Sequence, residues 1–368
     1  MVNKMRIQKN VLYTILVSFV FSVLGTLSSR DSLVIDVVKV PYFYTLLTLI
    51  CIFFCFPDFR YFPYNKSFSV MMIAFLASSF FNSDPAVWSS VLLIVLIPCF
   101  MKMSDEILFS IMFGTALGQL VFLFRYGLTD SWNGNSVCTA IALIVIICII
   151  CKQYKPPFWM LVLITFISEI ILIIMASRTS IIAFSLGVAY VLIVEGKKAN
   201  GKWSSRLTIL LVGVCLAAYK YRDMLFQLFL NKWENRGYSG ASLLTGRGDI
   251  WISELKYDWT VFGHGEGYFN SVYHHNDAHN IFIQVLGRYG SVALFLFIIF
   301  MIMVCVRMIR NRNEYSIVII PVVLSYLCAG MFENTLFIDC KMYIPAIEFL
   351  LAISILLRPK EGNRGIVQ

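Results

Sequence analysis

The sequence predicts an all-α polytopic membrane protein with about twelve transmembrane helices. Hydrophobic residues make up 59% of the 368 residues and charged residues only 14%, which is far from the balance of a soluble domain. Apolar runs recur along the whole chain, and a run of roughly 17–25 residues crosses about 30 Å of hydrocarbon as a helix. We therefore expect residues 1–368 to form a single transmembrane domain.

The polar segments between the apolar runs indicate the topology. An even number of spans places both termini on the same side, and most Lys and Arg at the span ends then fall on that side, so the positive-inside rule predicts cytoplasmic termini. No clear cleavage site follows the first apolar run, which we expect to stay attached as a helix. The expected spans are 11–28, 40–56, 68–82, 86–101, 106–124, 136–151, 158–177, 179–194, 207–219, 291–306, 316–333 and 342–357.

One long polar loop, residues 220–280, is predicted to lie outside the membrane, in the periplasm of a bacterium with two membranes. Nucleotides and cytoplasmic redox cofactors are not available there, which excludes most enzyme classes. The net charge of +9 is spread over the span ends and not gathered on one face, so the expected partner is the lipid bilayer and not nucleic acid. The ten cysteines lie almost entirely in or beside apolar runs, so we expect no disulfide framework.

All four histidines of the chain lie within residues 246–290: His264, His274, His275 and His279. His279, in DAHN, directly precedes an apolar run, so we expect it at the outer membrane surface near the start of a helix. An imidazole with an unperturbed pKa of about 6.5 can take a proton from a hydroxyl there. The i, i+4 spacing of His275 and His279 also fits a metal site, but the usual Glu is missing, and we expect no metal. HGEG is expected to be a plain turn and not an anion-binding nest.

Two arginines are candidates for binding an anion outside the membrane. Arg178, in SRTS, lies between two apolar spans, and Arg247 begins RGDIW. A guanidinium in such a place either pairs with a carboxylate or clamps a phosphate, and two of them can stabilise a departing pyrophosphate without a metal. Glu169 is an intramembrane carboxylate with either a functional role or a structural arginine partner. Trp251 is a candidate for stacking against a sugar.

The order and spacing of these motifs resemble those of the O-antigen polymerase and ligase family of bacterial membrane glycosyltransferases. The motifs are SRTS, GRGDIW, the glycine-rich turn, and DAHN followed by nine residues and Gly290. The resemblance implies a GT-C-type architecture with one large periplasmic loop, an inner-membrane location and an undecaprenyl-pyrophosphate-linked oligosaccharide donor, with no cofactor. It also implies that Arg178 and Arg247 engage the donor pyrophosphate and that His279 activates the acceptor hydroxyl. As substrate-binding candidates we add Asn280, Trp251, Asp249 and Glu169.

We expect a polymerase that joins lipid-linked repeats, with a chain-length regulator as a candidate partner. The alternatives are a ligase that transfers the glycan to lipid A core and, from another class, a flippase or exporter of lipid-linked oligosaccharide. Two features leave polymerase and ligase open. Ala293 stands where ligases often have Gly, Thr or Tyr, and the arginine-x10-glycine pattern of some polymerases is absent.

Overall fold

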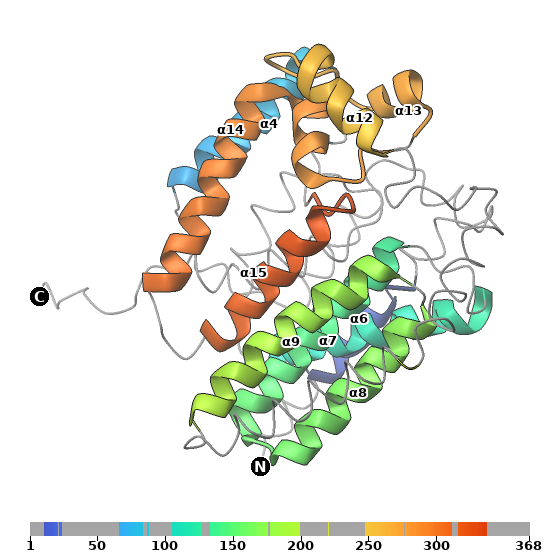
Figure 1. Cartoon of the computed structure of the whole chain (residues 1–368), viewed down its shortest axis with the longest axis vertical. Coiled ribbons are helices and arrows are strands. Elements are labelled where there is room, and N and C mark those ends of the chain that lie inside the picture. Colours follow the sequence, from blue (N-terminus) through green and yellow to red (C-terminus); the bar gives the residue numbers. More distant parts are fainter. Residues whose placement is uncertain are drawn as a thin grey trace, which may run out of the picture.

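The computed structural model describes residues 11–20, 22–23, 66–83, 87, 105–126, 133–175, 177–198, 220, 247–275, 277–310 and 316–336 (Figure 1). Within these ranges the chain consists of helices joined by turns and contains no strand, which confirms the all-helical prediction. Beyond the N-terminal helix Val11–Val20, the elements are α4 (Lys66–Phe81), α6 (Asp105–Tyr126), α7 (Asn133–Tyr154), α8 (Phe158–Ile174), α9 (Arg178–Lys198), α12 (Arg247–Ser253), the π-helical turn η1 (Glu254–Asp258), α13 (Tyr268–Tyr273), α14 (Ile281–Arg310) and α15 (Ser316–Gly330).

Three of the described helices are long and apolar enough to cross a membrane: Ser136–Tyr154, Arg178–Glu195 and Ile281–Val306. Shorter apolar helices coincide with five further predicted spans: Val11–Val20, Val70–Phe81, Leu108–Val121, Trp159–Ile174 and Val318–Gly330. Four predicted spans lie outside the described residues apart from Val87, namely 40–56, 86–101, 207–219 and 342–357. Residues 221–246 of the long loop lie outside them as well.

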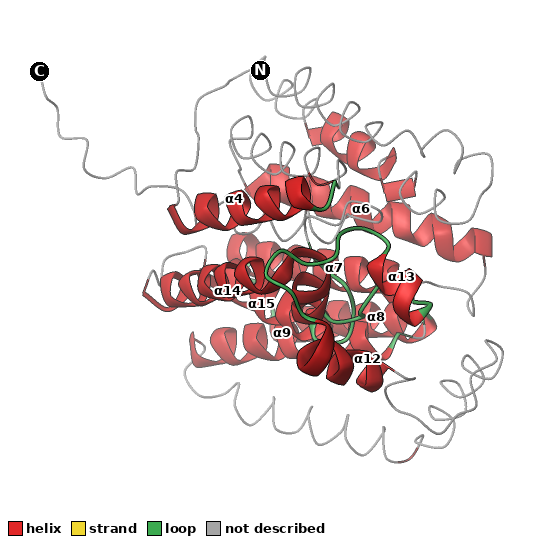
Figure 2. Cartoon of the chain, turned by 90° about the horizontal axis from the view of Figure 1, so that it is seen from above, coloured by secondary structure: helices red, strands yellow, loops and turns green. Residues whose placement is uncertain are grey.

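The helices form two groups that α15 connects. In the larger group α7 contacts α6, α8, α9 and α15 (Figure 1). Its side chains are buried nearly all round, as expected of a helix that is hydrophobic on every face. In the smaller group α14 lies beside α4 (Figures 1 and 2), and α15 contacts both α14 and the larger group. The short elements α12, η1 and α13 cap one end of the molecule.

Two separate contacts lie beneath this cap, one at the end of α4 and one where α14 begins beside the end of α15. The Ser78 hydroxyl, near the end of α4, donates to the carbonyl of Phe262 (2.7 Å). The Asn280 amide, at the start of α14, donates to the carbonyl of Met331 just after α15 (3.0 Å). The alternation of the predicted spans likewise places the end of 68–82, the start of 291–306 and the end of 316–333 on one side.

Helix α14 begins ten residues before the predicted span and is broken at Gly290. Gly290 has φ 90° and ψ 176°, a conformation that glycine alone adopts readily, and it separates residues 281–289 from 291–310. A helix break leaves carbonyl groups without partners before it and N–H groups without partners after it. We call residues 260–265, which lie across the break and supply these partners, the seal segment. The four backbone hydrogen bonds run from His264 N to Gly287 O (2.9 Å), Gly265 N to Arg288 O (3.0 Å), Ser291 N to Thr260 O (2.9 Å) and Val292 N to Val261 O (3.5 Å).

Glycines permit the close approach of the two backbones. A Cβ on Gly290 would overlap the carbonyl oxygen of Val261, and a Cβ on Gly263 would overlap that of Arg288. Helix α4 fixes the seal segment from its other side, since Asn82 Nδ2 also donates to Phe262 O (2.7 Å). HGEG is therefore a structural turn, as predicted, because its first two backbone N–H groups donate to carbonyl groups of α14.

Replacement of Gly290 by Ala should destabilise the protein strongly, because the new Cβ meets backbone atoms that cannot rotate away. The matched control is Gly267→Ala: Gly267 has a similar φ of 83°, but nothing lies within 4 Å of its Cβ position. We expect a loss of about 1 kcal/mol for Gly267→Ala and clearly more than about 3 kcal/mol for Gly290→Ala. Thermal unfolding in detergent, followed by size-exclusion chromatography, measures the difference. Equal midpoints for the two variants would show that the close backbone contact at Gly290 does not contribute to stability.

Candidate functional site

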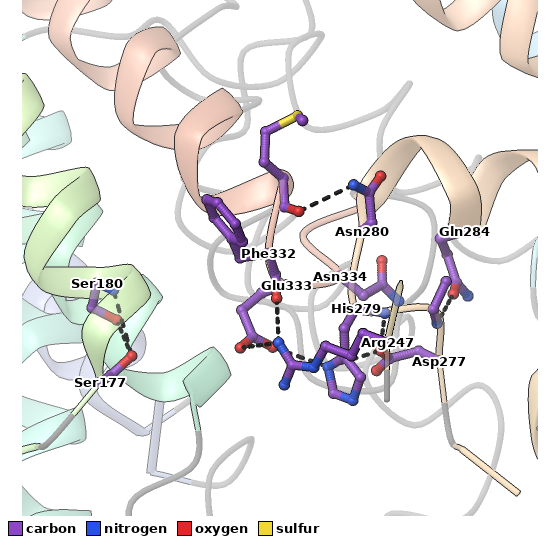
Figure 3. A network of polar contacts seen from close by, with 12 residues as sticks. Ser177, Ser180, Arg247, Asp277, His279, Asn280, Gln284, Phe332, Glu333 and Asn334 are labelled. Atoms are coloured by element: carbon purple, nitrogen blue, oxygen red, sulfur yellow. Dashed lines mark hydrogen bonds and ion pairs between the residues drawn. The ribbon is translucent and has the colours of Figure 1, made fainter. Parts of the chain in front are cut away.

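Glu333, three residues beyond the end of α15, joins two of the predicted site residues. Its Oε1 lies 3.5 Å from Arg247 Nη1, and its Oε2 lies 3.2 Å from His279 Nδ1 (Figure 3). Arg247 Nη1 also donates to the carbonyl oxygen of Phe332 (2.8 Å), so the guanidinium is fixed to the same short segment. The Glu333 side chain is only 8% exposed, and a carboxylate buried to this degree requires charged or hydrogen-bonding partners of this kind.

His279 is held by a second carboxylate as well. Asp277 Oδ1 lies 3.3 Å from His279 Nδ1 and accepts a hydrogen bond from the His279 backbone N–H (2.8 Å). The residue has φ 49°, a left-handed conformation that is uncommon outside glycine. With Nδ1 directed at Asp277 and Glu333, the imidazole donates from Nδ1 and keeps the lone pair of Nε2 for another partner. This is the arrangement that a general base requires.

Asn280 connects the start of α14 to the end of α15. Its Oδ1 accepts from the backbone N–H groups of Phe282 (2.9 Å) and Ile283 (3.2 Å), which is the N-cap of α14. Its Nδ2 donates to Met331 O, and the side chain is buried. The amide predicted to bind substrate is thus engaged within the protein, where it positions His279 beside Glu333.

Arg178 is the first residue of α9 and lies close enough to Arg247 for their charges to repel each other. Ser177, directly before it, shares a hydrogen bond with the Ser180 hydroxyl (2.8 Å) and accepts one from the Ser180 N–H (3.4 Å), and both side chains are buried (Figure 3). Two arginines and a helix N-terminus on one side favour an anion, since each contributes positive potential.

The two predicted residues of α12 differ in their environment. Trp251 Nε1 donates to the carbonyl of Ala278 (2.8 Å), directly before His279, and its ring packs against a small buried cluster of Ile250, Tyr268, Phe269, Ala278 and Ile283. Trp251 therefore supports the DAHN turn. Asp249 is exposed in the first turn of α12.

Glu169 lies apart from these residues. It is on α8 and accepts a hydrogen bond from the Ser185 hydroxyl (2.6 Å). Ser185 is seven residues along α9 from Arg178, which corresponds to roughly 10 Å along the helix axis. The structure therefore brings Arg178, Arg247 and His279 to one end of the helices but leaves Glu169 about two turns away.

The other histidines take different positions. His264 Nε2 contacts the carbonyl oxygen of Asp258 (2.6 Å), and the ring stacks on Tyr268 at 4.2 Å, so this residue is part of the cap. The spacing of His275 and His279 does not place them on one helical face, because α13 ends at Tyr273 and α14 begins at Ile281. Their rings lie 6.1 Å apart at 83°.

Two residues important to this geometry, Glu333 and Glu254, were not predicted from the sequence. Glu333 ends a predicted apolar span, and an acidic residue at the outer end of a span is the signal that could have identified it. Glu254, at the start of η1, is completely buried; its Oε2 accepts a hydrogen bond from the Tyr268 hydroxyl (2.8 Å), and its Oε1 has no partner among the described residues. Burial raises the pKa of the Glu254 carboxyl, and the Tyr268 hydrogen bond opposes this only in part.

Asp258, at the other end of η1, has a pKa shifted in the opposite direction from that of Glu254. Hydrogen bonds from the hydroxyls of Tyr273 (2.6 Å) and Ser253 (2.7 Å) lower its pKa. Tyr273 shifts the other way, because partial burial and its hydrogen bond to Asp258 raise the pKa of the Tyr273 hydroxyl. The two carboxyls therefore make stability depend on pH with opposite signs.

Replacement of Glu254 by Gln should remove a pH-dependent loss of stability. A raised pKa means that the folded protein holds the proton more tightly than the unfolded chain, so this stability is present below the unfolded value of about 4.5 and is lost as pH rises through the folded pKa. Relative to wild type, Glu254→Gln should gain stability as pH rises.

Asp258→Asn is the control. It should be less stable than wild type above the unfolded value of about 3.8, and this difference in stability should disappear as pH falls below that value. Thermal midpoints from about pH 2 to 8 measure both, because the Glu254 effect develops above pH 4.5 and the Asp258 effect is lost only below pH 3.8. Parallel curves for Glu254→Gln and wild type would contradict this assignment.

Comparison with known families gives a match over part of the chain. Residues 159–298 match the family model Wzy_C, described as O-antigen ligase. The match extends from α8 into α14 and includes Arg178, Arg247 and His279. No curated protein matches the chain. The Wzy_C match over this part of the chain supports the resemblance of its motifs to the O-antigen polymerase and ligase family.

Proposed function

We propose that the protein is an O-antigen polymerase, a GT-C-type glycosyltransferase of the inner membrane with both termini in the cytoplasm. It transfers a growing glycan from undecaprenyl pyrophosphate to a sugar hydroxyl of another lipid-linked repeat at the periplasmic face. The observation that carries the proposal is the carboxylate of Glu333 between Arg247 and His279. This contact joins a proton acceptor and a cation for the leaving group in one small network. A chain-length regulator is the protein partner we expect.

In the proposed reaction the acceptor hydroxyl oxygen forms a bond to the anomeric carbon of the donor. The bond from that carbon to the pyrophosphate oxygen breaks, and its electron pair leaves with undecaprenyl pyrophosphate. The hydroxyl proton passes to Nε2 of His279. Glu333 and Asp277, both beside Nδ1, stabilise the imidazolium that results.

The negative charge that develops on the leaving pyrophosphate is met by Arg178 and Arg247. Their mutual repulsion falls when an anion binds beside them, which favours binding of the pyrophosphate. Arg247 is also bound to Glu333, so its guanidinium approaches the donor in a fixed orientation. The two guanidinium groups supply the positive charge that the reaction needs at the leaving group.

A ligase is the second candidate, because the matching family model is described as O-antigen ligase. Polymerase and ligase share the donor, the leaving group and the base, and they differ only in the acceptor. A flippase needs no base held by carboxylates, and for this reason we rank it below both enzymes.

The test of the function uses the purified protein in nanodiscs with undecaprenyl-pyrophosphate-linked repeats, with and without lipid A core. We expect a ladder of products from the repeats alone, together with released undecaprenyl pyrophosphate. Product that forms only after lipid A core is added would make the protein a ligase. Transbilayer movement of the repeats without any new glycosidic bond would make it a transporter.

Replacement of His279 by Asn should abolish the ladder, with a rate loss of about 10²–10⁴-fold, typical of a missing general base. Asn tolerates the left-handed backbone of this position. The matched control is His274→Asn, because His274 also has a positive φ (56°) but is exposed and has no side-chain contact with Glu333. Both variants should reach the membrane in equal amounts, and only His279→Asn should lose polymer. Normal polymer from His279→Asn would exclude His279 as the base.

A further inference from the structure

His275 is held in place by the end of α13. Its backbone N–H donates to Phe269 O (3.2 Å), and that of His274 donates to Asn270 O (3.2 Å), while His274 ends the helix in a left-handed conformation. Helix α13 is anchored in turn, since Tyr268 and Phe269 are buried in the cluster against Ile283 of α14. The position of His275 therefore does not depend on the Glu333 network that holds His279.

The two imidazoles approach each other from these separate anchors. Their ring centres lie 6.1 Å apart, at 83° to one another, and no hydrogen bond joins them directly. Within the described residues, neither ring nitrogen of His275 has a hydrogen-bond partner, although the residue is half-buried. Two hydrogen bonds of about 2.8 Å to one oxygen span up to roughly 5.6 Å between nitrogens. The ring centres are 6.1 Å apart, which is close to this span, so a single hydroxyl can lie between the two rings.

The charge state of His275 selects the kind of group it can bind. Burial, and then the nearby charges of His279 and Arg247, lower the pKa of His275, so its ring is neutral at pH 7. A neutral imidazole offers one donor and one acceptor, which match the one donor and the lone pairs of a hydroxyl. A pyrophosphate oxygen accepts only, and cationic arginines already lie nearby to receive it.

We propose that His275 binds the acceptor: it hydrogen-bonds the attacking sugar hydroxyl and holds it against Nε2 of His279. This inference rests on the proposed function and deepens it, since it divides the site into a donor side with Arg178 and Arg247 and an acceptor side with the two imidazoles. His275 takes no proton in the reaction. It determines where the acceptor hydroxyl lies and thereby contributes to the choice of acceptor.

The test varies acceptor and donor independently. A fluorescent repeat on a shortened polyprenyl carrier serves as acceptor, at a saturating concentration of undecaprenyl-pyrophosphate-linked donor. His275→Phe keeps an aromatic ring but removes both hydrogen-bonding nitrogens, and it should raise the KM for the acceptor about tenfold, the effect of one lost hydrogen bond to a neutral group. The donor KM and kcat should change by less than about twofold. His275→Gln, which keeps a donor and an acceptor, should recover part of the loss, and His274→Asn should resemble wild type.

The outcomes separate this inference from the proposed function. Wild-type transfer with an unchanged acceptor KM in His275→Phe would overturn the inference and leave the function intact. A fall in kcat with both KM values unchanged would overturn it as well, because that pattern indicates a structural or proton-transfer role. Absence of transfer by wild type itself would overturn the proposed function and, with it, the role of His275.

Discussion

The backbone hydrogen bonds across Gly290 are the constraint on which the site depends. In an apolar environment each unpaired N–H or C=O costs several kcal/mol, so a break inside a membrane helix persists only where other groups replace the lost bonds. Residues 260–265 supply those groups, and α4 fixes them through the carbonyl of Phe262. The break allows the segment 281–289 to end at Asn280 under the cap while 291–310 continues as an ordinary apolar helix.

The charged network depends on this backbone arrangement. Asn280 caps α14 and binds the end of α15, which brings Glu333 beside His279. Arg247 then reaches the other oxygen of the same carboxylate from α12. Partly buried charges are tolerated here because each has an opposite charge or a carbonyl within hydrogen-bonding distance. A single shared carboxylate also fixes the distance between the proposed base and the proposed cation for the leaving group.

Much of the fold could be predicted from the sequence, because apolar length and charge at span ends are local properties. The position of His279 at a helix start could also be predicted, since a polar turn meets an apolar run at that point. Contacts between segments distant in the sequence could not be predicted. Glu333 pairs with Arg247 and His279 only because α15 packs antiparallel to α14, and Glu169 is separated from them by two turns of helix, although its place in the sequence gives no sign of this.

The polar residues next to His279 illustrate a second limit. Asn280 directly before an apolar run has the pattern of a helix cap, and the structure shows its amide in that role, whereas the sequence led us to assign it to substrate. Trp251 likewise uses its indole N–H on the backbone of Ala278. Residue type and neighbourhood suggested chemistry for both, but the partner of a polar group depends on the tertiary fold.

The contact between the seal segment and α14 consists almost wholly of main-chain hydrogen bonds, and this determines which residues of the cap can change in sequence. A hydrogen bond between peptide groups does not depend on the side chains that flank it. Among the described residues of this contact, Gly263 and Gly290 are the two whose identity is imposed by the close approach of the two backbones. Exposed side chains of the same region, such as Tyr257 and Trp259, can be replaced without changing the contacts that position His279. Under the proposed function, changes in the surface loops can alter which sugar is preferred while His279, Glu333 and Arg247 keep the same geometry.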